Sequence, residues 1–385
     1  MFDTMKKTLP KRIGYPLLAL GGDLKCQPAL AHNEQVEMLE LIGDLAFPEA
    51  QDALEKVMDR YHPSVLVCDK HPAYFSANMA RRLAQEKGIR LFEVQHHEAH
   101  VAAVCMEHGL FYESIVGLAF DGTGYGDDGS AWGGEFFVGS PSSGFKRKAH
   151  FAPVPVPGGD AAVRKPWRMA LALMLERNLE RETMMAWLKR CRLPLTDFDR
   201  FQKAFRSGFL GGRSTSLGRW FDVVSALLGM GLECAFEAQG AIQLQQAAES
   251  MKSQDVQTVC PVAVSESELR VIDYPDLALF AQTESWDSPS MAYAFHVATA
   301  QAVADVAKEL AEKAGVVDVV ASGGCFLNTL FSGLLEERIR QHGLRLILPS
   351  ALPPGDQAIA LGQIALALNE LDGEVASKEG KRRCA

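Results

Sequence analysis

The sequence predicts an α/β protein made of two lobes, and three observations lead to this prediction. The chain of 385 residues is long enough for two lobes that each bury a core. Extended stretches open both halves of the chain, and alternating helices and strands follow them. A long helical stretch interrupts only the second half. Two such halves facing each other form a cleft, as in the two-lobed fold of actin-like ATPases, Hsp70 and sugar kinases, whose duplicated halves are of the RNase H type.

In the first half, residues 1–12 are expected to be a loose N-terminal tail and residues 13–113 the first lobe. Its opening extended stretches are expected at 16–20, 25–30 and 35–42. Gly21-Gly22-Asp23 is a strong turn signal between the first two. The hydrophobic periodicity then predicts a helix at 48–61, a strand at 65–68, a helix at 71–87, a strand at 89–94 and a helix at 97–108.

The second lobe is expected to span residues 114–355, with a helical insertion at about 161–251. Strands are predicted at 115–120, 131–138 and 145–151, with a long glycine-rich turn at 121–129. The remaining elements are predicted at 291–314, 316–321, 328–342 and 344–348. A C-terminal helix at 356–370 would pack back toward the first lobe, followed by a mobile tail at 371–385. One doubly wound sheet with an inserted helical domain is the alternative, but the repeated hairpin openings disfavour it.

Composition excludes several kinds of protein. No apolar run approaches the roughly 20 residues that cross a bilayer, and residues 1–11 lack the apolar core of a signal peptide. A net charge of −9 argues against a broad nucleic-acid surface. The eight cysteines include no C-x-x-C pair. We therefore expect a cytoplasmic protein with reduced thiols that binds neither nucleic acid nor membrane.

Three histidines lie within five residues, where a predicted strand meets a predicted helix. On that helix His96 and His100 project from one face, whereas His97 points elsewhere. Two imidazoles one turn apart can share a metal ion. A helix that happens to begin with histidines is the alternative. Because α/β proteins bind ligands at such junctions, the position favours a metal site.

Two aspartates could complete this site. Asp121 ends the strand predicted at 115–120, and Asp356 precedes the last helix. The alternatives are a turn aspartate and a helix N-cap, respectively. With the two histidines they would offer two nitrogen and two oxygen ligands, which suit Fe(II), Zn(II) or Mn(II). These ligands do not choose between the three ions, of which we favour Fe²⁺, with Zn²⁺ as the alternative.

Four glycine-containing turns follow predicted strands, at 21–25, 121–129, 157–160 and 322–325. Glycine lets backbone amides approach phosphate oxygens, and a helix start adds positive charge from its dipole. Across a cleft, the two hairpin turns would face the phosphates, and the loop that begins at Ser322 would hold the nucleoside. The sequence has neither the P-loop nor the dinucleotide-binding fingerprint.

Structural and functional interpretations remain equally open for three further polar residues. Asn328 either caps a helix or contacts ribose or phosphate. Asp222 either pairs with Arg219, is solvated, or faces ribose hydroxyls. Glu237 begins a helix, where the dipole favours an acid in any case.

Six motifs resemble the C-terminal carbamoyltransferase domain of HypF, the [NiFe]-hydrogenase maturation family, over about residues 16–368. They are LALGGDLK from Leu18, VQHHEAH from Val94, AFDGTGYGDDGSAWGGEF from Ala119, PVPGGDAAVRKPWRMAL from Pro155, SGGCFLN from Ser322 and LPPGDQAIALGQ from Leu352. The superfamily also includes tRNA threonylcarbamoyltransferases and antibiotic O-carbamoyltransferases. The tRNA-modifying members typically have a Ser-Gly-Gly-His loop at the position of Asp121. That loop is absent here, which argues against a tRNA-modifying activity.

The resemblance implies a metal held by His96, His100, Asp121 and Asp356. It implies transfer of a carbamoyl group from carbamoyl-adenylate to the C-terminal cysteine of HypE, for synthesis of the cyanide ligand. ATP and AMP are related ligands that it also implies, and Mg²⁺ is a further candidate. Asp121 and His97 are the expected catalytic residues, His97 as a proton acceptor. The expected nucleotide contacts are Gly122, Thr123, Gly124, Gly159, Asp160, Asp222, Glu237, Gly240, Gly323, Gly324 and Asn328.

The sequence also departs from this family. HypF proteins carry an acylphosphatase domain, C-x-x-C zinc fingers and a domain that makes carbamoyl-adenylate, which are absent here. We therefore expect either a short form served by a separate adenylate-forming protein or an excised domain. Glu237-Ala238-Gln239-Gly240 replaces an expected Glu-Gly-Gln-Ala. One alternative is O-carbamoylation of a small molecule, which a hydroxyl acceptor would favour. The other is a non-catalytic nucleotide-binding maturation partner, which nucleotide binding without carbamoyl transfer would favour.

Overall fold

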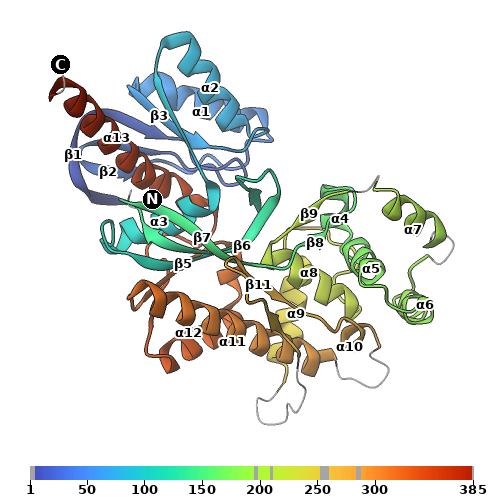
Figure 1. The fold of residues 1–385 in the computed structure, drawn as a ribbon. Coiled ribbons are helices and arrows are strands. Elements are labelled where there is room, and N and C mark those ends of the chain that lie inside the picture. The colour runs from blue at the N-terminus through green and yellow to red at the C-terminus, as the bar shows by residue number, and fades with distance from the viewer. Residues whose placement is uncertain (1–4, 195–197, 209–210, 252–259, 283–287, 384–385) are drawn as a thin grey trace.

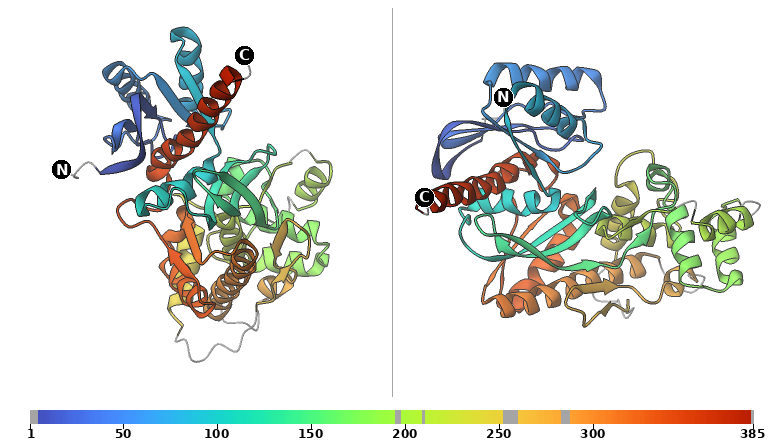
Figure 2. Two further views of the ribbon diagram at one scale, coloured as in Figure 1. Left: turned by 60° about the vertical axis from the view of Figure 1, so that its left-hand side comes forward. Right: turned by 45° about the horizontal axis from the view of Figure 1, so that its top comes forward.

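The computed structural model describes residues 5–194, 198–208, 211–251, 260–282 and 288–383. Two separate β-sheets, each accompanied by helices, form the two lobes of the molecule (Figure 1). Helix α3 (His96–His108) lies between the lobes in each view (Figure 2). The predicted two-lobed α/β fold of the actin-like class is confirmed.

The first sheet has the strand order β2-β1-β3-β4. Its elements are β1 (Lys6–Ala19), β2 (Ala29–Met38), α1 (Pro48–Tyr61), β3 (Val65–Asp69), α2 (Phe75–Lys87) and β4 (Arg90–Val94). Strands β1 and β2 are antiparallel, whereas β3 pairs in parallel with both β1 and β4. The prediction of three short opening strands is wrong, because two long strands form this hairpin.

The predicted N-terminal tail is also wrong, because β1 already begins at Lys6. Leu9 and Ile13 are buried in this strand, each with 5% of its surface exposed. Basic residues separate these apolar positions in the sequence, so the segment is polar on average although two of its side chains join the core.

The second sheet contains the complete set of strands expected of an RNase H-type half. The order β7-β6-β5-β12-β13 places an antiparallel meander beside two parallel strands. The elements are β5 (Ile115–Tyr125), β6 (Ala131–Ser140), β7 (Gly144–Phe151), β12 (Asp318–Ser322) and β13 (Arg345–Ile347). Strands β11 (Arg270–Asp273) and β10 (Ala263–Val264) extend the sheet beyond β7. The first sheet lacks a counterpart of β7, so the two halves are unequal.

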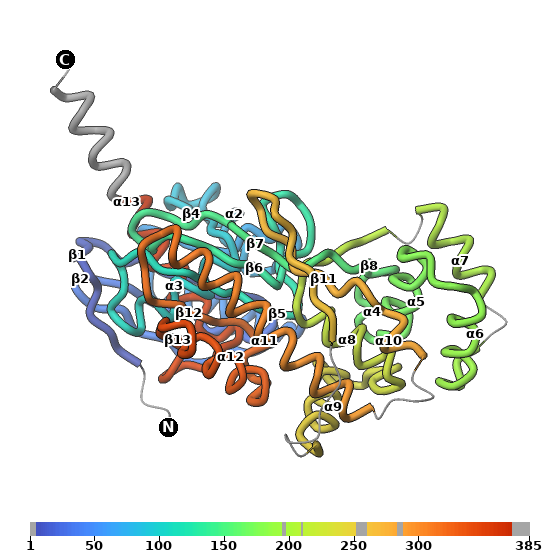
Figure 3. Tube along the Cα trace, turned by 60° about the horizontal axis from the view of Figure 1, so that its bottom comes forward, coloured from blue at the N-terminus to red at the C-terminus, as the bar shows by residue number. Residues whose placement is uncertain are grey.

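A helical region follows the meander of the second sheet. It comprises β8 (Val154–Pro155), α4 (Asp160–Arg164), α5 (Trp167–Glu176), α6 (Arg181–Arg190), α7 (Phe198–Arg206), β9 (Arg213–Ser214), α8 (Leu217–Leu227) and α9 (Gln239–Glu249). In Figure 3 helices α5 to α8 gather at one end of the molecule, and β1 and β2 lie at the other. Helices α10 (Ala278–Ala281), α11 (Ser288–Ala314) and α12 (Thr329–Gln341) complete this lobe.

The glycine-rich stretch after Phe120 differs from the simple turn that we predicted. Strand β5 continues to Tyr125, and its register with β6 shifts between Phe120 and Gly124. The turn itself lies farther on, where the Gly126 amide donates to the Ser130 carbonyl at 2.9 Å. A β-bulge bends a strand and redirects its side chains, and Asp121 occupies this irregular segment.

Helix α13 (Ile359–Arg383) packs on α3, with the short helix η2 (Asp356–Ala358) before it. The predicted C-terminal helix therefore begins slightly later than expected. Helix α13 continues through the tail predicted at 371–385 as far as Arg383, and Leu371 is still buried with the core. The mobility of that tail stays a prediction. Residues 384–385 lie outside the described residues. The residue boundaries predicted for the two lobes and for the helical insertion stay predictions.

Among the described residues, no helix combines the length and the apolar character needed to cross a membrane.

Gly362 is required for the close contact between α13 and α3. A methyl group at this position would overlap the carbonyl oxygen of Ala99. We expect Gly362→Ala to lower the free energy of unfolding by at least the roughly 1–3 kcal/mol typical of an overpacked core. Urea denaturation of the purified protein would measure this loss.

Gly333 provides the matched control, because it is also helical but has no neighbouring atom within 4 Å of an added Cβ. Gly333→Ala should stabilise α12 by about 0.5–1 kcal/mol through helix propensity. Equal effects of the two substitutions would contradict the packing role of Gly362.

Candidate metal and nucleotide site

The four predicted metal ligands lie together where the two lobes meet. Their ligand atoms all lie within 4.8 Å of one another. The Nε2 atoms of His96 and His100 are 3.7 and 3.5 Å from Asp121 Oδ2, respectively. The same atoms are 3.8 and 3.6 Å from Asp356 Oδ1. Bonds of about 2.1 Å to one tetrahedral ion would separate its ligands by about 3.4 Å, close to these values.

The residues fit a divalent cation. Both Nε2 atoms are buried and have no hydrogen-bond partner among the described residues. Buried polar atoms normally have partners, so two convergent orphan nitrogens point to a missing ligand. Asp121 and Asp356 supply negative charge opposite them. Two nitrogens and two carboxylate oxygens suit Fe²⁺ or Zn²⁺ and do not choose between them.

A third aspartate orients His96. Asp69 ends β3 with 1% of its surface exposed, and its Oδ2 lies 2.7 Å from His96 Nδ1. Its Oδ1 accepts the His71 amide at 2.8 Å, which fixes the carboxylate. In the neutral ring the proton is therefore held on Nδ1, which leaves the Nε2 lone pair for a metal ion. His100 has a weaker support, since its Nδ1 is 3.5 Å from the Ser322 hydroxyl.

Electrostatic interactions couple the four groups. Burial opposes charge on His96, but Asp69 and Asp121 raise its pKa well above the ordinary value. Burial is likewise outweighed for His100, whose pKa Asp121 and Asp356 raise. Burial would raise the pKa of Asp121, yet its contacts with both histidines hold it well below the usual range. Metal binding would therefore have to displace protons from the imidazoles.

Gln95 positions the start of α3 and selects a tautomer of His97. Its Oε1 accepts the amides of His97 and Glu98 at 2.5 and 3.1 Å. Its Nε2 is left to donate, and it lies 3.2 Å from His97 Nδ1. The neutral ring then carries its proton on Nε2, which has no partner among the described residues.

Burial and the neighbouring His96 lower the pKa of His97 well below its ordinary value. A neutral ring protonated on Nε2 donates a hydrogen bond from that atom and accepts no proton there. The geometry thus favours a donor, and the expected role of His97 as a proton acceptor stays a prediction.

Two of the predicted phosphate-binding glycines contact the cluster directly. The Gly324 amide donates to Asp121 Oδ1 at 3.1 Å. A Cβ added at Gly124 would lie 3.0 Å from a ring carbon of the cluster residue His96 and 2.6 Å from the ring of His97. Gly323 adopts φ 108°, a conformation that glycine adopts readily, and leads into the short helix η1 (Gly324–Leu327). These positions require glycine because ligand residues or backbone fill the space of a side chain.

The structure divides the other predicted nucleotide contacts into buried and exposed groups. Asp222 and Gly240 are buried beside each other, with an added Gly240 Cβ 3.3 Å from Asp222 Oδ1. Gly122 is partly buried. Thr123, Gly159, Asp160 and Glu237 are exposed. No described contact brings Gly159, Asp160 or Glu237 to the metal cluster.

The structural alternatives are observed for two of the three polar residues that we left open. The third, Glu237, does not begin a helix as predicted, because α9 begins at Gln239 with Ala238 as its N-cap. Asn328 caps α12, because its Oδ1 accepts the Phe331 amide at 2.9 Å. Its Nδ2 lies 3.0 Å from His296 Nε2. Asp222 pairs with Arg219, whose Nη1 is 2.9 Å from Asp222 Oδ2. Asn328 and Asp222 therefore each have a structural partner, and their contact with a nucleotide stays a prediction.

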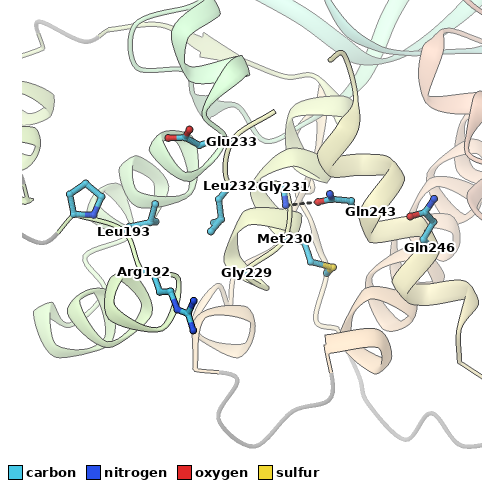
Figure 4. A pocket seen from close by; sticks show the side chains of 10 residues that line it. Arg192, Leu193, Gly229, Met230, Gly231, Leu232, Glu233, Gln243 and Gln246 are labelled. Atoms are coloured by element: carbon cyan, nitrogen blue, oxygen red, sulfur yellow. Dashed lines mark hydrogen bonds between the residues drawn. The ribbon is translucent and has the colours of Figure 1, made fainter. Parts of the chain in front are cut away.

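A pocket of about 690 Å³ lies beside the buried residue Gly240 (Figure 4). It is lined by Arg192, Leu193, Pro194, Gly229, Met230, Gly231, Leu232, Glu233, Gln243 and Gln246. The Gly231 amide donates to Gln243 Oε1 at 2.7 Å. On its other side Gly231 abuts Gly240, with an added Cβ 2.5 Å from the Gly240 Cα. None of the lining residues belongs to the predicted site.

Asp69 and Arg219 lie beside the predicted site residues but were not predicted from the sequence. A single aspartate at the end of a short strand carries no spacing signal toward a histidine 27 residues away. Arg219 was considered only as a partner of Asp222. Its position opposite the glycine-rich segment follows from the path of α8, which no local pattern reveals.

Two family models match the chain. "HypF Kae1-like domain" matches residues 13–107, and "Carbamoyltransferase, Kae1-like Domain, second subdomain" matches residues 117–363. A "Carbamoyltransferase HypF homolog" of Cupriavidus necator is 35% identical over 381 residues, covering 94% of each chain. "Carbamoyltransferase HypF" of Synechocystis sp. is 32% identical, covering 93% of this chain and 48% of its own.

Two solved structures are also similar over nearly the whole chain. Full-length HypF in a phosphate- and nucleotide-bound form superposes with a TM-score of 0.85 at 29% identity, covering 96% of this chain and 57% of that one. HypF of T. kodakarensis gives 0.84 at 28% identity, covering 97% and 49%. The chain thus spans about half of several relatives, but nearly all of the Cupriavidus homolog.

Removing both histidines should abolish metal binding. We expect the double variant His96→Ala/His100→Ala to retain no stoichiometric Fe²⁺ or Zn²⁺ in elemental analysis, because only two carboxylates remain. His108→Ala, an exposed position on the same helix, should bind metal like the wild type. In the wild type, affinity should rise with pH through neutrality as the imidazoles lose protons. Stoichiometric metal in the double variant would refute the site.

Removing the charge of Asp69 should weaken the site without destroying it. We expect Asp69→Asn to lower metal affinity about 10–100-fold, the usual effect of losing a partner that orients a ligand. Competitive titration with a chromophoric chelator would measure the change. Ser322→Ala, which removes the weaker support of His100, should have a smaller effect. Unchanged affinity in Asp69→Asn would show that Asp69 does not tune His96.

Proposed function

Because the chain belongs to the HypF family of carbamoyltransferases, we propose that it transfers the carbamoyl group of carbamoyl-adenylate to the C-terminal cysteine of HypE. The observation that carries this proposal is the buried His/Asp cluster beside backbone amides of a glycine-rich loop. The His/Asp cluster can bind a divalent cation, and the neighbouring backbone amides can bind an anionic substrate. The reaction would take place in the cytoplasm.

The chemistry is an acyl transfer between two heteroatoms. The sulfur of the acceptor cysteine attacks the carbamoyl carbon, and the bond from that carbon to the phosphate oxygen breaks. AMP leaves with the electron pair, and the thiol loses its proton. The products are a thiocarbamate on the acceptor and AMP. The nucleophile comes from the partner protein, so this chain needs no serine or cysteine nucleophile of its own.

The chain's residues would bind and orient the reactants. His96, His100, Asp121 and Asp356 would hold a divalent metal, which supplies Lewis-acid stabilisation of charge on a carbonyl or phosphate oxygen. The backbone amides of the glycine-rich segments would bind the phosphate. The Nε2–H group of His97 would donate a hydrogen bond to an oxygen on which negative charge develops.

Carbamoyl-adenylate would reach this site from a separate protein. A separate adenylate-forming partner is part of the proposal. Neither ATP nor Mg²⁺ would be needed at the transfer step itself.

A transfer assay tests this function. Labelled carbamoyl phosphate and ATP are supplied with HypE, with and without an adenylate-forming domain, and label is followed on the C-terminal cysteine of HypE. We expect label only when that domain is present. The variant His96→Ala/His100→Ala should transfer none, whereas His108→Ala should transfer at the wild-type rate.

The other outcomes are decisive as well. Label without the added domain would mean that this chain also makes the adenylate. No label despite a verified adenylate supply would exclude HypE as the acceptor. A labelled small-molecule hydroxyl would then identify an O-carbamoyltransferase, and nucleotide binding without any transfer would identify a non-catalytic partner.

A further inference from the structure

Arg219 is a buried cation whose hydrogen-bonding groups are largely unused. It lies in the first turn of α8 with 7% of its surface exposed. Its Nε and Nη1 atoms are buried and make no hydrogen bond to any described residue. A buried guanidinium is costly unless its charge is paired and its N–H groups are bonded. Its unmet donors therefore indicate a missing anionic partner.

Asp222 holds this cation in place but does not satisfy it. Its Oδ2 lies 2.9 Å from Arg219 Nη1, three residues earlier on the same helix. The two charges form an ion pair, although the N–H is not aligned for a hydrogen bond. This contact uses Nη1, and the other terminal nitrogen of the guanidinium is Nη2.

Nη2 faces the glycine-rich segment. An added Cβ at Gly122 would lie 3.3 Å from Arg219 Nη2, and among the described residues it would meet no other atom within 4 Å apart from its chain neighbours. The space in front of Gly122 is therefore bounded by the guanidinium. Gly122 directly follows the metal-cluster residue Asp121 in β5.

The start of α8 approaches the same segment. An added Cβ at Gly218 would lie 3.0 Å from the Gly122 Cα and 3.1 Å from the Asp121 carbonyl oxygen. Ser216 caps the helix by accepting the Arg219 amide at 3.1 Å, and its hydroxyl donates to the Asp121 carbonyl at 2.5 Å. The positive end of the helix dipole and the guanidinium thus converge on the Gly122 face.

We propose that Arg219, oriented by Asp222, recognises the phosphate of the nucleotide at the Gly122 face and so selects a 5′-phosphorylated adenosine over the free nucleoside. The inference rests on the proposed function, since it places the adenylate at this site. A planar fork of N–H donors matches phosphate oxygens better than a point charge does. The same residue would stabilise AMP as the leaving group. Asp222 is thereby a positioning residue for Arg219, in place of a contact to ribose.

Comparing AMP with adenosine separates recognition of the phosphate from the integrity of the site. Affinities of the metal-loaded full chain for both ligands are measured by calorimetry. We expect the wild type to bind AMP more tightly than adenosine. Arg219→Gln should lower AMP affinity about 10–100-fold, the range for losing charge-assisted hydrogen bonds, and leave adenosine binding unchanged.

Two further variants keep the test decisive. Arg213→Gln is the matched control, because Arg213 lies on nearby β9 but pairs with Glu176 and is half-exposed; it should bind both ligands like the wild type. Arg219→Lys keeps the charge without the fork, and should bind adenosine normally and AMP several-fold more weakly. If Arg219→Gln fails to fold, Arg219→Lys decides between the outcomes.

The failure of this inference and of the proposed function give different results. If the wild type binds both ligands but the Arg219 variants weaken both equally or neither, Arg219 does not read the phosphate and the inference is overturned. If the wild type binds neither AMP nor adenosine, the proposed function itself fails.

Discussion

The burial of helix α3 between the two lobes is the constraint on which the site depends. From His96 to Glu107 every residue of this helix except Glu98 is buried. One side packs on α13 through Gly362, and other residues meet the second sheet at β5 and β12. A helix enclosed on all sides cannot rotate without disrupting both cores. Its histidine pair is therefore held rigidly where strand β5 and the short helix η2 deliver the two aspartates.

Charge is arranged around this helix in a way that suits the proposed chemistry. Three carboxylates surround two imidazoles on the metal side, so the site attracts a cation. Arg219 and the start of α8 lie on the other side of Asp121 and attract an anion. An acyl-adenylate bridging the two would bring its carbamoyl oxygen toward the cation and its phosphate toward the guanidinium. Both charges lie away from bulk water, where electrostatic interactions are strong.

The four predicted metal ligands, which the structure brings together, could be picked out from the sequence because their signals are local. His96 and His100 share a helical spacing, and Asp121 and Asp356 each stand next to an element boundary. Prediction from the sequence failed where structure depends on distant contacts. The strand that begins at Lys6 was not predicted, because basic residues separate its buried leucine and isoleucine. The glycine-rich sequence at the bulge near Asp121 predicts a turn, although the strand continues through it. Asp69 and Arg219 acquire their positions only through packing, so no pattern in the chain could identify them.

Anomalous diffraction from crystals of the metal-loaded protein tests the central claim most directly, namely that one cation is shared by four residues at the junction of the lobes. With Fe²⁺ or Zn²⁺, we expect a single strong peak about 2.0–2.2 Å from the Nε2 atoms of both histidines and from an oxygen of each aspartate. A peak elsewhere, or coordination that omits any one of the four residues, would contradict this claim, because the four would then not share one cation.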